Sequence, residues 1–196
     1  ASFEQALLAA NLLAPEGLES LLLIAADEYH EVFSGLFDPS VMRDGTPADG
    51  GGGLVLRPAA PGAGPVLTPG WFGPADAPGA WPGLIALHGG AAAIRGRFGA
   101  VLAGIPAARR EEGQRDLAGF IAQTRFDGPV VDYRPLTGEF ASASAVAAVW
   151  AQAWMRRGGL PAALCGGRCG DLAGRGVLVL GLGTWLTSYT LEPGGA

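Results

Sequence analysis

The chain has 196 residues, a net charge of −5 at pH 7 and a mean hydropathy of +0.29, with 49% hydrophobic residues. This length is sufficient for one domain with a substantial core, and no uninterrupted apolar run reaches the ~18 residues that a transmembrane helix needs. All 13 basic residues are Arg and form no basic stripe interleaved with aromatic residues, which argues against a nucleic-acid surface. No basic segment precedes the first apolar run, so we expect no signal peptide and a cytoplasmic protein with no membrane partner.

The first part of the chain predicts one helix and two strands. The spacing of Leu7, Leu8 and Leu12 indicates an amphipathic helix over residues 2–13. Residues 21–26 form a continuous apolar run, which predicts a strand buried on both faces. After an irregular, glycine-rich segment, residues 54–56 predict a further strand.

The acidic residues Asp27 and Glu28 follow the first strand and have two interpretations. They form an acid/base pair, or they end the strand and accept hydrogen bonds from local backbone N–H groups. We favour the second interpretation. His30, which follows them, is interpreted as a solvated loop residue.

The middle of the chain predicts alternating strands and helices. Strands are expected at 65–68 and 100–105, and helices at 84–97 and 109–124. The aromatic residues Trp71, Phe72 and Trp81 are expected in loops that pack on the core. His88 lies inside the first of these helices, so a surface or structural role is favoured over a catalytic one.

Residues 129–158 predict a strand–turn–helix unit, around which the other elements of the chain are expected to be arranged. A short β-branched strand is followed by a turn at 134–138, and a helix then runs to the glycines at 158 and 159. This helix begins with small residues, which predicts that its first turns pack very close to another element. Glu139 at its start either caps the helix or belongs to an active site.

The chain ends with a predicted hairpin, in which residues 177–180 and 184–191 are joined by a tight turn at 181–183. The alternation of strands and helices predicts the α/β class. Cys165 and Cys169 are interpreted as a reduced pair in a loop, in preference to a metal site or a disulfide.

The order of these elements resembles the second part of a β-ketoacyl synthase, which has the thiolase fold. The resemblance is carried by the segments SFEQALLAA, LLLIAADE, GGGLVLRP, VLAGIP, RPLTGE and GLGTWLTSYTL. It implies a layered α/β/α/β/α fold, to which residues 1–57 give the end of the first half and residues 58–196 give all of the second half. It also implies a preceding segment that is cleaved or separately encoded, bears the rest of the first half and is held against this chain non-covalently.

The resemblance also implies where a site would lie. The family's nucleophilic Cys would immediately precede Ala1, one family His falls on Gly104, and the second falls on Glu139, with Arg134 in place of a Lys. The family's glycine gate falls on residues 181–183. The implied catalytic candidate is Glu139, and the implied substrate-contacting residues are Phe3, Gly104, Arg134, Leu182 and Thr184.

These departures from the family pattern matter because condensation needs a thiolate and donors that stabilise the developing enolate. Gly104 has no side chain, and an ionised Glu139 would repel that negative charge. The pattern therefore resembles the chain length factor, an inactive ketosynthase-like subunit that shapes the acyl tunnel of a heterodimer in polyketide or fatty-acid biosynthesis. The implied partners are an active ketosynthase and, through it, an acyl carrier protein with its phosphopantetheine-linked acyl chain; no cofactor or metal is implied.

Two alternatives stay open. The chain is part of an active β-ketoacyl-ACP synthase or acyltransferase whose nucleophilic Cys lies in the preceding segment, with Glu139 as acid or base. The other is a stand-alone α/β binding protein without thioester chemistry.

Overall fold

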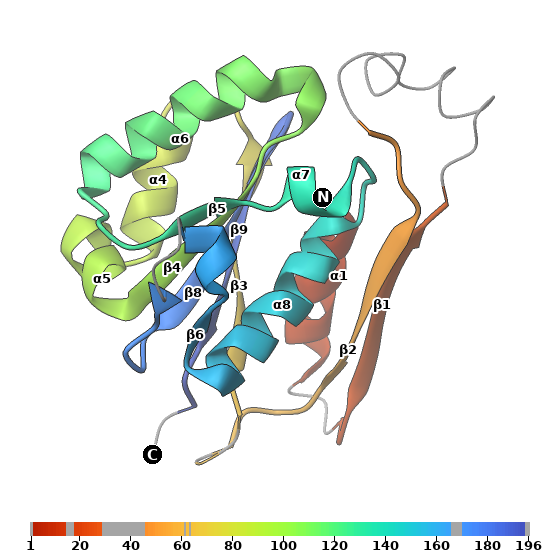
Figure 1. Ribbon diagram of the computed structural model, residues 1–196. Coiled ribbons are helices and arrows are strands. Elements are labelled where there is room, and N and C mark those ends of the chain that lie inside the picture. Colours follow the sequence, from red (N-terminus) through yellow and green to blue (C-terminus); the bar gives the residue numbers. More distant parts are fainter. Residues whose placement is uncertain are drawn as a thin grey trace.

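The computed structural model describes residues 2–14, 18–28, 46–60, 62, 64–165 and 170–194. Two β-sheets enclose a layer formed by the helices α1 (Ser2–Leu13) and α8 (Ala143–Arg157), and further helices cover the outer face of the larger sheet (Figure 1). The observed class is therefore mixed α/β, as predicted. None of the helices in these described ranges is both long and apolar enough to cross a membrane.

The smaller sheet pairs β1 (Leu21–Asp27) with β2 (Gly50–Leu56) in antiparallel register. Its inner face packs on α1 and α8 and buries Leu23 and Leu54. Its outer face leaves Leu22, Ile24 and Val55 62%, 66% and 64% exposed. The prediction of a strand buried on both faces was therefore wrong, because successive side chains of a strand alternate between faces and nothing in the described chain covers the outer one.

The larger sheet has five strands in the order β3-β9-β8-β4-β5. β4 is parallel to both β5 and β8, while β9 is antiparallel to β8 and to β3. Parallel neighbours require crossovers, and these run through α6 and α8. The elements concerned are β3 (Val66–Pro74), β4 (Phe98–Gly104), β5 (Val130–Asp132), β8 (Gly176–Leu182), β9 (Trp185–Glu192) and α6 (Arg110–Thr124).

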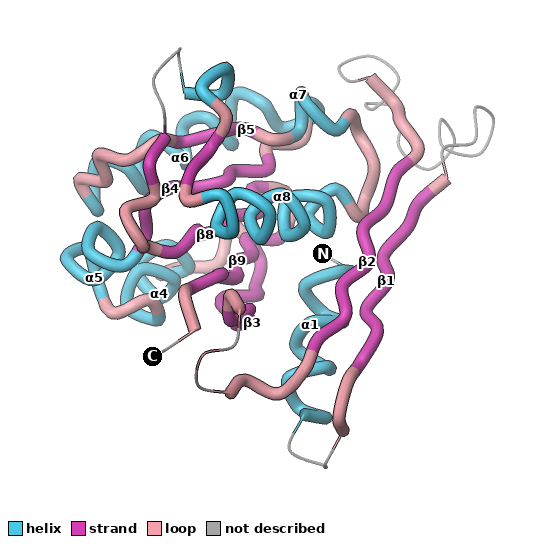
Figure 2. The backbone as a smooth tube through the Cα atoms, turned by 60° about the horizontal axis from the view of Figure 1, so that its bottom comes forward, coloured by secondary structure: helices cyan, strands magenta, loops and turns pink. Residues whose placement is uncertain are grey.

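Both faces of this sheet are buried, which explains its continuous apolar strands. From β4, Ala100 and Leu102 join the core that α1 and α8 share, whereas Val101 and Ala103 join the core beneath α4, α5 and α6. Figure 2 shows these two helix groups on opposite sides of the sheet. The covering helices are α4 (Ala80–Leu87) and α5 (Gly90–Arg97), together with α6.

Several element boundaries differ from those expected. The helix predicted over residues 84–97 is divided into α4 and α5, because Gly89 and Gly90 adopt left-handed φ values of 87° and 85°. β3 is longer than predicted and contains Trp71 and Phe72, which were expected in loops. The remaining short elements are η2 (Ala107–Arg109), α7 (Arg134–Thr137), β6 (Gly159–Leu160), η3 (Ala162–Cys165) and β7 (Gly170–Asp171).

α1 occupies the predicted residues but buries a different face. Phe3, Leu7 and Ala10 are buried, whereas Leu12 is 75% exposed. The buried positions follow the helical spacing i, i+4 and i+7 between the two sheets, and Leu12 lies off that line. His30 and Cys169 lie outside the described residues, and Cys165 is a free cysteine.

The first turns of α8 pack directly on β2, as the small residues predicted. A Cβ atom added to Gly52 would lie 2.8 Å from the backbone C and O of Ala145. The Ser142 N–H, at the N-cap of α8, donates to the Asp27 carboxylate at 2.6 Å. Asp27 ends β1, as expected, and its carboxylate joins the end of this strand to the start of α8.

We expect Gly52→Ala to destabilise the protein by about 1–3 kcal/mol, because the added methyl group would force the α8 backbone away from β2. The matched control is Gly53→Ala, since a Cβ at Gly53 meets nothing within 4 Å. Denaturant unfolding of both variants measures the difference. Equal free energies of unfolding for the two variants would show that the contact does not constrain the fold.

His88 is a buried structural residue at the end of α4, in agreement with the structural role that was favoured. It is 4% exposed, and its Nε2 lies 2.9 Å from Ser188 Oγ, which accepts the Trp71 N–H at 2.7 Å. Burial, together with the nearby Arg97 charge, lowers the pKa of His88 to about 4.

Acidification should therefore weaken the fold through His88. Its pKa in the folded protein, about 4, is below the ordinary 6.5, so the unfolded chain binds the proton first and stability falls as pH drops from 6.5 towards 4. Between pH 7.5 and pH 5 this loss amounts to about 2 kcal/mol. Unfolding of the wild type and of His88→Gln at both pH values tests the assignment: the variant should lose correspondingly less stability on acidification.

Candidate functional site

A cavity of about 190 Å³ lies where the carboxyl ends of β4 and β8 meet the first turns of α1 and α8. The turn between β8 and β9 closes one side of it. Carboxyl ends of parallel strands are a common location for sites in α/β proteins. The cavity is lined by Glu4, Gly104, Pro106, Tyr133, Arg134, Ala141, Ser144, Gly181, Leu182, Gly183, Thr184, Trp185 and Thr187.

The structure brings most of the predicted site residues together here. Gly104, Arg134, Leu182 and Thr184 line the cavity, although they come from three separate parts of the chain. Phe3 does not line it: its side chain is fully buried, and its ring packs edge-on against Tyr189 at 5.5 Å.

Glu139 lies beside the cavity and holds a loop in place. Its Oε1 accepts the Ala107 N–H at 3.2 Å, and its Oε2 is 3.7 Å from an Arg134 guanidinium nitrogen. Arg134 also donates to the carbonyl of Phe140. Glu139 does not cap α8, whose N-cap residue is Ser142, so that interpretation was wrong and its bonds instead fix the segment after β4.

Gly104 is glycine because Tyr133 occupies the space that a side chain would need. A Cβ atom at Gly104 would lie 2.1 Å from the Tyr133 hydroxyl oxygen and 2.4 Å from its Cζ. Burial, and secondarily the Glu4 carboxylate, raise the pKa of Tyr133 well above its usual range, so the phenol remains protonated at neutral pH. At this position the cavity wall is therefore a neutral hydroxyl.

The sequence did not single out Glu4 and Ser144, which also line the cavity. Glu4 is 4% exposed, and its carboxylate accepts from the Thr187 hydroxyl at 3.4 Å. Ser144 is 5% exposed, and its Oγ has no hydrogen-bond partner among the described residues. The signal for Glu4 was its place one residue after Phe3, at the start of a buried helix; Ser144 lay unmarked in a run of small residues.

Asp132 positions the same loops from the end of β5. Its Oδ1 accepts from the backbone N–H of Ile105 at 3.4 Å and of Arg134 at 3.1 Å. Its Oδ2 accepts from the Arg110 guanidinium at 2.9 Å. A charged residue at the end of a short β-branched strand was the sequence signal for this role.

The functional groups of the lining side chains determine which chemistry the cavity can support. They offer one carboxylate, one guanidinium, a phenol and hydroxyl groups, and among them there is no thiol, imidazole or amine. A serine needs an adjacent base to act as a nucleophile, and none is bonded to Ser144 in the described chain. The cavity can accept a small polar group, and none of its described lining residues is an activated nucleophile.

Comparison of the chain with models of known protein families gave no match, and comparison with curated proteins gave none either.

A double-mutant cycle tests the packing of Tyr133 against Gly104. Gly104→Ala alone should destabilise the protein by about 1–3 kcal/mol, because the methyl group overlaps the phenol. In a Tyr133→Leu background the same change should cost about 1 kcal/mol less, because the overlapping hydroxyl is gone. Additive free energies of unfolding would show that the two residues do not contact each other as described.

Proposed function

We propose that this chain is a non-catalytic, ketosynthase-like subunit, similar to a chain length factor, that shapes the acyl tunnel of a β-ketoacyl synthase heterodimer. One observation carries the proposal. Residues from β4, the segment after β5 and the β8–β9 turn surround one cavity beside the first turn of α1, where the resemblance places a condensing site. That cavity holds neither a thiol nor an imidazole among its lining residues.

The side chains present argue against catalysis by this chain alone. Condensation needs a thiolate to carry the acyl group and neutral donors near the developing enolate. Glu139 already accepts from Ala107 and lies beside Arg134, and Tyr133 fills the space beside Gly104. The proposed role therefore rests on the shape of the cavity wall, in which Leu182 is the largest aliphatic side chain.

The exposed outer face of the smaller sheet is an argument for a protein partner, as the thiolase-like proposal requires. Within the described chain, β1 and β2 pair with each other alone, and their outer face exposes Leu22, Ile24 and Val55. All strands of the larger sheet lie after residue 65. This fits the proposed division of the chain into residues 1–57 of a first half and residues 58–196 of a second half. We propose that a preceding segment of the protein completes the smaller sheet as the rest of a first thiolase-like half.

The active ketosynthase would carry the growing acyl chain, and an acyl carrier protein would deliver it in the cytoplasm. The alternative of an active enzyme with its Cys in the preceding segment is favoured by one feature: the first turn of α1, which bears Glu4, opens on the cavity. The two functions differ in which polypeptide becomes acylated.

Intact-mass measurement after incubation with acyl-loaded carrier protein separates these functions. In a complex reconstituted from this chain, its preceding segment and the ketosynthase that co-purifies with it, we expect the acyl adduct on the ketosynthase alone. An adduct on the preceding segment or on this chain would establish the active-enzyme alternative. A complex that yields no ketosynthase at all would leave the stand-alone binding protein as the surviving hypothesis.

In the same complex, Leu182→Phe should shift the products towards shorter acyl chains, because the larger ring reduces the space inside the cavity. The matched control is Leu136→Phe, at an α7 residue that is 48% exposed. Product lengths measured by mass spectrometry should change for the first variant and not for the second. Unchanged lengths in a folded Leu182→Phe complex would contradict the proposed role of this wall.

A further inference from the structure

A second, larger cavity of about 710 Å³ lies at the opposite end of α1, between the two sheets. It shares no lining residue with the candidate functional site. Along α1 the two linings come nearest at Glu4 and Leu7, about one helical turn apart, and the second cavity extends from Leu7 towards Ala14. The two cavities are therefore distinct, and a ligand of the larger one is independent of the proposed function.

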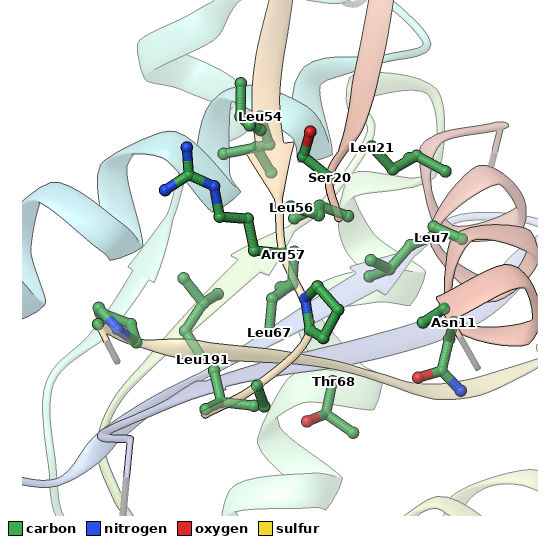
Figure 3. A pocket seen from close by; sticks show the side chains of 18 of the residues that line it. Leu7, Asn11, Ser20, Leu21, Leu54, Leu56, Arg57, Leu67, Thr68 and Leu191 are labelled. Carbon is green, nitrogen blue, oxygen red and sulfur yellow. The ribbon is translucent and has the colours of Figure 1, made fainter. Parts of the chain in front are cut away.

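Aliphatic side chains form most of the lining of this cavity, together with the polar side chains of Asn11, Ser20, Thr68 and Gln152. Figure 3 shows leucines from four elements around the same hollow: Leu7 of α1, Leu56 of β2, Leu67 of β3 and Leu191 of β9. Leu7 and Leu191 are 2% and 3% exposed, so the cavity reaches down to the main core. Its volume falls within the ~300–1,000 Å³ of ordinary small-molecule sites.

The charged side chains among the described residues that line this cavity have a single sign. Arg57, at the end of β2, and Arg156, in the last turn of α8, line it, and no Asp or Glu is among its lining residues. Within the described parts of the chain neither guanidinium has a hydrogen bond or an ion pair. Both arginine side chains are exposed, so their positive charges lie in solvent at the edge of the cavity.

We propose that this cavity binds an amphiphile with one apolar chain and an anionic head group. The chain would lie among the leucines, where each buried methylene contributes about 0.8 kcal/mol in favour of binding. The head group would lie beside Arg57 and Arg156, whose planar guanidinium groups match carboxylate and phosphate oxygens. No bond is made or broken, so the site is one of binding alone.

Isothermal titration calorimetry with three probes of equal chain length tests the head-group preference. We expect dodecanoate to bind about tenfold more tightly than dodecyltrimethylammonium, with dodecanol between them. Binding of dodecanoate should show a negative heat-capacity change, because apolar surface is buried. Absence of dodecanoate binding, or equal affinity for the cationic probe, overturns the proposal.

Charge-removing variants locate the head group. Arg57→Gln and Arg156→Gln should each weaken dodecanoate binding about three-fold to five-fold and leave dodecanol binding unchanged. Arg115→Gln is the matched control, because it removes one exposed charge on α6, away from the cavity. An equal loss in all three variants would indicate a general charge effect and reject the site.

A cavity-filling variant locates the apolar chain. Leu67→Phe should weaken dodecanoate and dodecanol binding alike, by about tenfold, if it keeps the wild-type circular dichroism and melting temperature. Undiminished affinity in that folded variant places the ligand elsewhere and rejects the site. If Leu67→Phe does not fold, the head-group series and the arginine variants decide the question.

Discussion

The contact between α8 and β2 is the constraint on which the rest of the fold depends. α8 packs on both sheets at once, so its two sides must each match a β-surface. On one side the approach is so close that Gly52 leaves no room for a Cβ beside Ala145. The carboxylate of Asp27 then binds the N-terminus of α8 and fixes the position of the helix along the sheet. Close backbone contact and a charged cap together set where α8 begins.

The start of α8 in turn sets the candidate site. Ser144 lies in its first turn and lines the cavity, while Glu139, four residues before Ala143, accepts from the loop that follows β4. Asp132 holds the same loop from the end of β5. Two carboxylates, each bonded to backbone N–H groups, therefore determine the position of the loop between Gly104 and Ala107. Hydrogen bonds from backbone N–H groups stabilise the charged form of these two carboxylates, which suits a structural role better than proton transfer.

Much of the fold could be predicted from local patterns, because buried strands and amphipathic helices carry strong periodic signals. β4 and β8 begin within two residues of their predicted starts, and α8 ends at Gly158 as predicted. β8 continues through Gly181 and Leu182, which were expected in the turn. The exposed face of β1 could not be predicted, because a continuous apolar run looks the same whether one face or both faces are covered. The left-handed Gly89 and Gly90 divide a helix whose apolar pattern continues across them. The gathering of Gly104, Arg134, Leu182 and Thr184 was predicted through a resemblance, whereas the partners of Asp27 and Tyr133 depend on tertiary contacts that no local pattern encodes.

The contact between Gly104 and Tyr133 bears most directly on whether the cavity can support acid–base chemistry. A side chain at position 104 and a phenol at position 133 cannot occupy the same space, since a Cβ would lie 2.1 Å from the hydroxyl oxygen. The phenol stays protonated because burial raises its pKa, so it cannot act as a base near neutral pH. Placing an imidazole at position 104 would therefore require a smaller residue at position 133 as well, and the single substitution would disrupt the packing. The wall at this position is thus fixed by packing, which is consistent with a cavity whose contribution is its shape.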